Sequence, residues 1–408
     1  PLRNQFRQGK ALVDLYALGR RDVDGVYETG GWMAELEYPQ RTGMLDHVAQ
    51  KIQWVYDHYL AGTDATCYLS VVPDKHYYLS QTNGYPALDY NGLIQSLRAQ
   101  IPAMPYIDLT DLLSLDDYYR TDSHWRQEKI LPVAQRLAET MGASIDGPEV
   151  YAPQRFNRAF VGRYAVQLGL TMEHDTLTYL TSPTLHQCYT VVYDQMGRPQ
   201  RGKVYEVAYG HKNYPYVMFL SGSKGLIKLT NLKAPSDKNL ILFRDSFGSS
   251  LTPLLASGYR TITLVDLRYI TSAELGKYLE VTDQDVLFLY STLLLNNSMV
   301  YILIVYTLFV VFRRFQPSLN TTMSVEYSEQ SGKPYGPIRM MGAVGYALMM
   351  MAIIQIAGKL GVPQTFYMFS IIAAANIGIL FFLPKMEGHN TRESGKKVSP
   401  AVLVKCRP

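Results

Sequence analysis

The stretch that decides the fold covers residues 240–250, Leu240-Ile241-Leu242-Phe243-Arg244-Asp245-Ser246-Phe247-Gly248-Ser249-Ser250. Its apolar start is typical of a strand that is buried on both faces, and the small residues after it predict a turn into a helix. Strands that lead directly into helices indicate a parallel α/β sheet, which places its site at the carboxyl ends of its strands. Ser246 lies just past such an end, so we expect an exposed nucleophile there.

Similar apolar runs recur over the first 296 residues, with segments of helical periodicity between them. We therefore predict a mostly parallel sheet with helices on both faces. From about 150 to 235, short runs rich in Tyr, Val and Thr indicate an inserted antiparallel patch or lid. The other predicted strands are 67–72, 106–109, 262–265 and 286–290, and the predicted helices are 1–20, 44–60, 93–100 and 126–141.

A second stretch, residues 118–125, reads Tyr-Tyr-Arg-Thr-Asp-Ser-His-Trp and sets Asp122 two residues before His124. In an extended or turn conformation, side chains two residues apart point to one side, so the carboxylate can hold the imidazole. A serine hydroxyl needs such an oriented base to become a nucleophile. If the stretches meet, Asp122, His124 and Ser246 form the catalytic triad of a serine acyl-transfer enzyme. The alternative is a surface turn with an ordinary histidine and a strand-capping turn at Ser246.

Residues near the two stretches are further candidates. The predicted helix start at 247–249 would offer backbone N–H groups to an oxyanion, and Asn231 is a candidate for the same role by residue type alone. We expect Tyr119, Arg244 and Asp245 to pack behind the site. Four tyrosines would either stack on sugar rings or pack strands, namely Tyr205, Tyr209, Tyr214 and Tyr216.

Composition excludes several other classes of function. The formal net charge of +4 is too small to indicate nucleic-acid binding. Cys67, Cys188 and Cys406 stand alone, without the spacing of a zinc site or a disulfide framework, and no cofactor is indicated. The chain begins at Pro1 without a leader, so we interpret it as a fragment.

Several ordered motifs over about 1–297 resemble the SGNH-hydrolase-like domain of alginate O-acetylation proteins, and in particular the Gram-positive branch called DHHW proteins. One departure is position 123, because the branch is named for Asp-His-His-Trp and this chain has Ser123. We expect that side chain to point away from its neighbours, with little effect. The segments that carry the resemblance are 1–6, 24–27, 72–75, 119–125, 219–223, 244–250, 265–269 and 287–297.

The resemblance implies an SGNH-hydrolase-like sheet in which Ser246 is the nucleophile, His124 the base and Asp122 its orienting carboxylate. It further implies an extracytoplasmic O-acetyltransferase that acts on cell-surface polysaccharide and receives its acyl group from a membrane-bound acyltransferase. In that scheme the serine takes the acyl group, the histidine acts as base and then as acid, and a sugar hydroxyl is the second nucleophile. Polysaccharide binding without turnover is the alternative.

The last third of the chain is different in character. Residues 293–312, 340–357 and 366–383 are apolar runs of about the length of a bilayer crossing, so we predict about three transmembrane helices over 298–384 and a basic cytoplasmic tail over 385–408. The distribution of Arg and Lys places the catalytic domain outside the cell membrane.

Residues 315–320 and 335–346 resemble the major facilitator superfamily, in its nucleoside- or sugar-proton-symporter-like branch. Three crossings are only part of such a transporter and cannot enclose its central cavity, so transport by these helices ranks below the enzyme interpretation. The two resemblances meet near 297–299, which indicates a spliced or fragmentary chain. The alternative is an enzyme with a natural three-helix anchor.

Overall fold

The computed structural model describes residues 8–40, 42–169, 174–194, 197–212, 214–222 and 224–295, with scattered residues between 321 and 345. The chain divides into two compact units, Pro1–Ser298 and Met299–Pro408. The predicted membrane runs lie almost wholly outside the described residues, as do the transporter-like motif at 315–320 and about half of that at 335–346. Among those that are described, no helix combines the length and the apolar character that a bilayer crossing requires.

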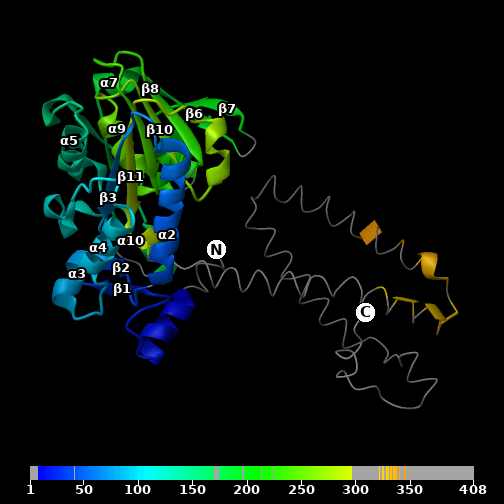
Figure 1. The fold of residues 1–408 in the computed structure, drawn as a ribbon. Helices are drawn as coiled ribbons and strands as arrows, with labels where there is room; N and C mark the ends of the chain where they lie inside the picture. The colour runs from blue at the N-terminus through cyan, green and yellow to red at the C-terminus, as the bar shows by residue number, and fades with distance from the viewer. Residues whose placement is uncertain are drawn as a thin grey trace. The chain divides into compact units, whose positions relative to one another are not determined.

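The first unit is built on a seven-stranded sheet with the order β3-β11-β9-β10-β8-β6-β7 (Figure 1). The first four of these strands pair in parallel, and the last three are added by antiparallel pairing. The predicted α/β fold is thus confirmed, as a mixed sheet. Its strands are β3 (Thr66–Val72), β6 (Cys188–Tyr193), β7 (Pro199–Gly202), β8 (Leu226–Asn231), β9 (Asn239–Arg244), β10 (Thr261–Val265) and β11 (Asp285–Ser291).

Helices cover both faces of this sheet, as predicted (Figure 1). Alternate residues of a strand point to opposite faces, and along β9 Leu240 and Leu242 enter one core whereas Ile241 and Phe243 enter the other. The first core is closed by α5 and α9, the second by α2 and α4. The helices are α2 (Thr42–Val55), α3 (Lys75–Asn83), α4 (Tyr90–Gln100), α5 (Leu131–Thr140), α6 (Arg163–Leu168), α7 (Pro183–Gln187), α8 (Val207–Lys212), α9 (Phe247–Leu255) and α10 (Thr292–Leu295).

The segment predicted as an antiparallel insertion is only partly separate. β4 (Ala152–Arg155) and β5 (Thr178–Thr181) form a two-stranded sheet of their own. However, β6, β7 and β8 extend the central sheet beyond β10. Sequence periodicity could not reveal this because a strand's pattern shows its burial and not its partner. A second small sheet consists of β1 (Val26–Thr29) and β2 (Trp32–Glu35).

Two predicted elements differ locally from the structure. Residues 106–109 do not form a strand, because only Tyr106 makes a parallel bridge, to Leu69 of β3. The helix predicted from 126 begins at Leu131, with Pro132 in its first turn. A proline is well tolerated in that turn because it lacks the N–H group that would remain without a partner there. The segment before it, Gln127–Lys129, is a separate short turn.

Candidate active site

Ser246 occupies the turn between β9 and α9, where it is half-buried between buried neighbours. The turn is fixed by the carboxylate of Asp245. One oxygen accepts the N–H of Phe247 at 3.0 Å, and the other accepts the N–H and hydroxyl of Ser291 at 2.8 and 2.6 Å. Asp245 therefore joins the start of α9 to the end of the neighbouring strand β11, and leaves Ser246 at the tip of a rigid turn.

The loop that carries Asp122 and His124 is equally constrained. Tyr118 and Trp125 form an antiparallel bridge across it. The carboxylate of Asp175 accepts the backbone N–H groups of Arg120 and Thr121 at 2.9 and 2.8 Å. Such bonds hold an irregular backbone in one conformation, since they satisfy polar groups that no helix or strand pairs.

Gly162 packs directly against the backbone of this loop. Its N–H group donates to the hydroxyl of Thr121 at 2.9 Å. A Cβ atom at position 162 would lie 2.2 Å from the carbonyl oxygen of Thr121 and 2.6 Å from the backbone nitrogen of Asp122. Only glycine fits at this position, because both of these atoms belong to the backbone and cannot rotate away.

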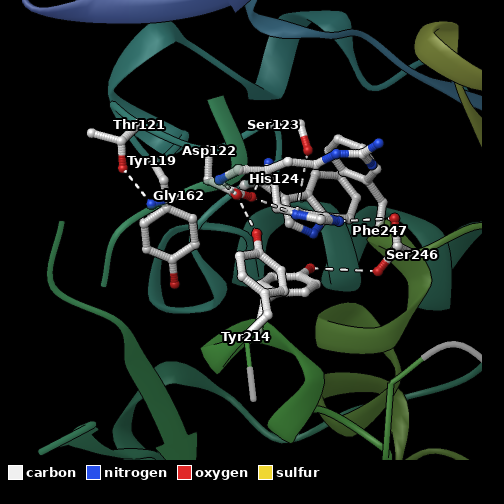
Figure 2. A network of polar contacts seen from close by, with 12 residues as sticks. Tyr119, Thr121, Asp122, Ser123, His124, Gly162, Tyr214, Ser246 and Phe247 are labelled. Atoms are coloured by element: carbon white, nitrogen blue, oxygen red, sulfur yellow. Dashed lines mark hydrogen bonds and ion pairs between the residues drawn. The ribbon is translucent and has the colours of Figure 1, made fainter. Parts of the chain in front are cut away.

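The two predicted stretches meet at His124 (Figure 2). Its Nδ1 atom lies 2.6 Å from Oδ1 of Asp122, and its Nε2 atom lies 2.8 Å from the hydroxyl of Ser246. Carboxylate, imidazole and hydroxyl thus form one continuous hydrogen-bonded chain. Ser123 does not point away as predicted, because its hydroxyl lies 3.4 Å from Nδ1 of His124. The bond of that nitrogen to Asp122 is much shorter and determines the orientation of the ring.

Asp122 is fully buried and yet held in its charged form. Burial alone would raise its pKa, but attraction to His124 and several hydrogen bonds outweigh this and hold the pKa below its usual value. Its Oδ2 atom accepts the N–H of Arg163 at 2.7 Å and the hydroxyl of Tyr214. The carboxylate can therefore stay ionised opposite the imidazole.

Tyr216 packs face to face on the imidazole of His124, with ring centroids 3.8 Å apart and an interplanar angle of 17°. Its hydroxyl is 2.8 Å from the hydroxyl of Ser250, one turn of α9 beyond Ser246. The indole N–H of Trp125 donates to the same Ser250 oxygen at 2.9 Å. Ser250 thus connects the histidine loop and the tyrosine to the helix that follows the candidate nucleophile.

Lys75 lies behind the Asp122 loop with its side chain fully buried. Its ammonium group donates to the carbonyl oxygens of Tyr119 and Arg120 at 2.9 and 3.1 Å. Burial lowers the pKa of Lys75 to about 7, although Asp122 and two other carboxylates act to raise it. Burying an ammonium group costs free energy, because the carbonyl groups replace only part of its hydration. In return, Lys75 fixes the residues that lead into Asp122.

The groups predicted to stabilise an oxyanion have other partners. The N–H groups of Phe247 and Gly248 donate to Asp245, and that of Ser249 donates to the carbonyl of Ser246. The amide of Asn231 donates to the carbonyl of Ala256 at 3.0 Å, at the opposite end of α9 from the candidate nucleophile. The assignment of Asn231 by residue type alone was therefore wrong.

The residues predicted to pack behind the site do so. Tyr119 and Arg244 are buried, and the guanidinium group of Arg244 lies 3.7 Å from the carboxylate of Asp266. Of the four tyrosines predicted either to stack on sugars or to pack strands, Tyr214 and Tyr216 contact Asp122 and His124, and Tyr205 donates to the carbonyl of Leu180 at 2.7 Å. Tyr209 is 44% exposed. Sequence reasoning missed the roles of Lys75, Tyr214 and Tyr216, for which no local pattern gave a signal.

Comparison with known proteins supports the fold. The sequence matches no family model and no curated protein. A crystal structure of a DHHW family protein from Eubacterium siraeum is similar, with a TM-score of 0.56 and 19% identity over 68% of this chain and 94% of that chain. The structure of Bacillus cereus PatB1 with a sulfonyl adduct is similar with a TM-score of 0.52 and 18% identity, over 67% and 97% of the two chains. This likeness confirms the fold that the sequence resemblance implied.

Proposed function

We propose that the unit Pro1–Ser298 is a serine-dependent acyltransferase that moves an acetyl group to or from a polysaccharide hydroxyl outside the cytoplasm. The observation that carries the proposal is the hydrogen-bonded chain from Asp122 through His124 to Ser246. Its distances are those over which a base removes the proton of a nucleophile while a carboxylate orients the base.

The proposed reaction has two halves. Ser246 Oγ attacks the acyl carbonyl of a donor ester, and the proton of the hydroxyl moves to Nε2 of His124. That proton then goes to the departing alcohol, and an acyl-serine remains. In the second half an acceptor hydroxyl transfers its proton to His124 and attacks the acyl group, after which the proton returns to Ser246. Asp122 stabilises the imidazolium ion in both halves.

The backbone N–H of Ser246, which precedes the hydrogen-bond ladder of α9, is the donor that we assign to the oxyanion.

The substrate class depends on the sequence resemblance, and one comparison is consistent with the chemistry. PatB1, which shares this fold, has been described with a sulfonyl adduct. Such an adduct forms when an activated nucleophile attacks the sulfur of a sulfonyl reagent and the leaving group on that sulfur departs. A polysaccharide acceptor and a membrane-bound acyl donor are what the resemblance carried by the motifs around Asp122 and Ser246 implies.

Covalent labelling tests the nucleophile. The chain is treated with an aryl sulfonyl fluoride, and its peptides are analysed by mass spectrometry. We expect one adduct, on Ser246, and none in Ser246→Ala. Ser249→Ala is the matched control because Ser249 lies on the same helix start and its hydroxyl is not part of the chain from Asp122. Labelling that persists in Ser246→Ala would contradict the assignment.

Transfer itself is tested with an activated acetyl ester. The expected result is an acetyl adduct on Ser246 that is discharged faster when an acetyl-accepting oligosaccharide is added. If the adduct forms and only water discharges it, the enzyme is an esterase. If neither an adduct nor turnover is seen while the oligosaccharide binds equally to wild type and Ser246→Ala, the domain is a binding module and the proposal fails.

A further inference from the structure

The segment Tyr214-Pro215-Tyr216 contacts two members of the triad at once. The hydroxyl of Tyr214 donates to Oδ2 of Asp122 (Figure 2), and the ring of Tyr216 stacks on His124. Neither contact was expected, because the sequence suggested sugar stacking or strand packing for both tyrosines. Asp122 and His124 belong to a loop about ninety residues earlier, so the two segments are joined only by the fold.

We propose that Tyr214-Pro215-Tyr216 is a positioning clamp, in which one tyrosine fixes the carboxylate of Asp122 and the other fixes the imidazole of His124. The inference depends on the proposed function, since it concerns how that triad is aligned. Tyr216 is 4% exposed and lies beneath the ring of His124, so it acts through the base and not on the substrate.

The backbone makes this segment rigid. Pro215 begins a 3₁₀ turn, Pro215–Met218, and its ring fixes its own φ angle. The N–H of Val217 donates to the carbonyl of Tyr214 at 3.0 Å, and the N–H of Glu206 donates to the carbonyl of Met218 at 2.8 Å. The turn is thereby closed within itself and anchored to the preceding segment, so the two tyrosine side chains keep a fixed separation.

The side chains are held at their outer ends as well. The ring of Tyr214 packs near Phe160, with centroids 5.6 Å apart, and Tyr216 packs near Phe219 at 5.0 Å. The hydroxyl of Tyr216 is bonded to Ser250 on α9. The imidazole is therefore fixed relative to the helix that follows Ser246, and the carboxylate is fixed relative to the imidazole.

The chemical consequences differ between the two tyrosines. The Tyr214 hydroxyl occupies a lone pair of Oδ2, which leaves Oδ1 as the oxygen that faces His124. The face of the Tyr216 ring carries the negative part of its quadrupole, so it favours the imidazolium ion that forms when Ser246 loses its proton. The first effect orients the base and the second stabilises its charged form.

Kinetics on an activated acetyl ester test the clamp. We expect Tyr214→Phe to lower kcat about ten-fold, as for the loss of one hydrogen bond to a charged group, with little change in KM. In the Asp122→Asn background, Tyr214→Phe should not lower kcat further, because Tyr214 acts on His124 only through the carboxylate of Asp122. An effect of equal size in both backgrounds would overturn this half of the proposal. Tyr209→Phe is the control, as an exposed tyrosine of the same region.

Tyr216→Leu and Tyr216→Phe separate stacking from a general packing role. Phenylalanine keeps the aromatic face and loses the hydroxyl's bonds to Ser250 and, at 3.5 Å, to the carbonyl oxygen of Ser246. Leucine fills the space without a π system. We expect kcat to fall about ten-fold in the leucine variant and clearly less in the phenylalanine variant, which loses the anchor to α9 but keeps the ring face on His124. Equal losses in both would overturn the stacking argument.

A spectroscopic readout separates failure of the clamp from failure of the proposed function. The proton between Nδ1 of His124 and Oδ1 of Asp122, which lie 2.6 Å apart, should give a proton NMR resonance far downfield, with or without turnover. Tyr214→Phe should shift or broaden this resonance, and Tyr209→Phe should not. If wild type shows no acyl transfer but the resonance responds, the clamp holds and the enzyme assignment fails. If wild type is active and neither the resonance nor kcat responds, the clamp is refuted.

Discussion

Nε2 of His124 lies 2.8 Å from the hydroxyl of Ser246, although 122 positions separate the two residues. The contact exists because the turn after β9 is fixed by the buried carboxylate of Asp245, and the loop at 118–125 by the partly buried carboxylate of Asp175. The candidate site is thus assembled from two rigid pieces of backbone, and its geometry should be sensitive to substitutions at the points where those pieces are held.

Asp122→Asn should lower kcat about 10⁴-fold and leave the fold intact. An amide at this position can donate to Nδ1 of His124, which would favour the tautomer whose Nε2 atom cannot accept the serine proton. Hydrolysis of an activated acetyl ester measures the effect, and circular dichroism checks that the variant is folded. A loss of less than ten-fold would show that His124 does not need this carboxylate.

Lys75 should make stability depend on pH. Its folded pKa of about 7 lies below the value of about 10.4 in an unfolded chain, so between these values the unfolded chain binds more protons. The free energy of unfolding should therefore rise from pH 7 towards pH 9, by at most about 1.4 kcal/mol per pH unit.

Urea unfolding at both pH values measures this rise for the wild type and for Lys75→Met, which should lose it. Lys212→Met is the control, because Lys212 is exposed and should leave the pH dependence unchanged. An equal rise in wild type and Lys75→Met would show that the dependence comes from other groups.

Gly162→Ala should damage activity and stability together. The added methyl group would lie 2.2 Å from the carbonyl oxygen of Thr121, so the backbone before Asp122 must move. We expect a loss of about 1–3 kcal/mol in the free energy of unfolding, as for overpacking, and a fall in kcat. Gly43→Ala, at a position of α2 where a Cβ meets nothing within 4 Å, should leave kcat unchanged and should not lower the free energy of unfolding. Wild-type activity in Gly162→Ala would mean that the loop tolerates displacement.

Asn231→Ala should lower stability without a direct effect on chemistry. Its amide is bonded to Ala256 and Lys233, and the carbonyl of Ala256 would lose a buried donor at a cost of about 1–3 kcal/mol. At a temperature where both proteins are folded, kcat should match that of the wild type. A selective fall in kcat would restore Asn231 as an oxyanion donor.

All four parallel strands could be predicted from the sequence because each is a short apolar run followed by a turn. Leu240 to Phe243 alternate between two cores, and a run that is apolar on both faces can only be central. The pairing of β8 with β10 could not be predicted in the same way. This pairing depends on which edge of the sheet is left without a partner strand, and the pattern of apolar residues within 226–231 does not indicate that edge.

The same limit applies to the site. Asp122 and His124 are neighbours in sequence, so their contact follows from local geometry, and Ser246 follows from its place after a strand. The contacts of Tyr214 and Lys75 join segments that are about 45 to 90 residues from the loop they support. The oxyanion donors were predicted wrongly because the N–H groups at a helix start are available to a ligand only when no nearby residue accepts them. Here the carboxylate of Asp245 accepts the N–H of Phe247.

The bonds that Ser291 donates to Asp245 limit how far the unit Pro1–Ser298 can be shortened at its C-terminal end. The last strand of the sheet contributes a hydroxyl and an N–H to the carboxylate beside the candidate nucleophile, and Thr292 donates to Asp74 at the adjacent strand end. Any minimal catalytic fragment must therefore retain position 292. A protease cut upstream of it should abolish labelling of Ser246 even though no part of the hydrogen-bonded chain itself has been removed.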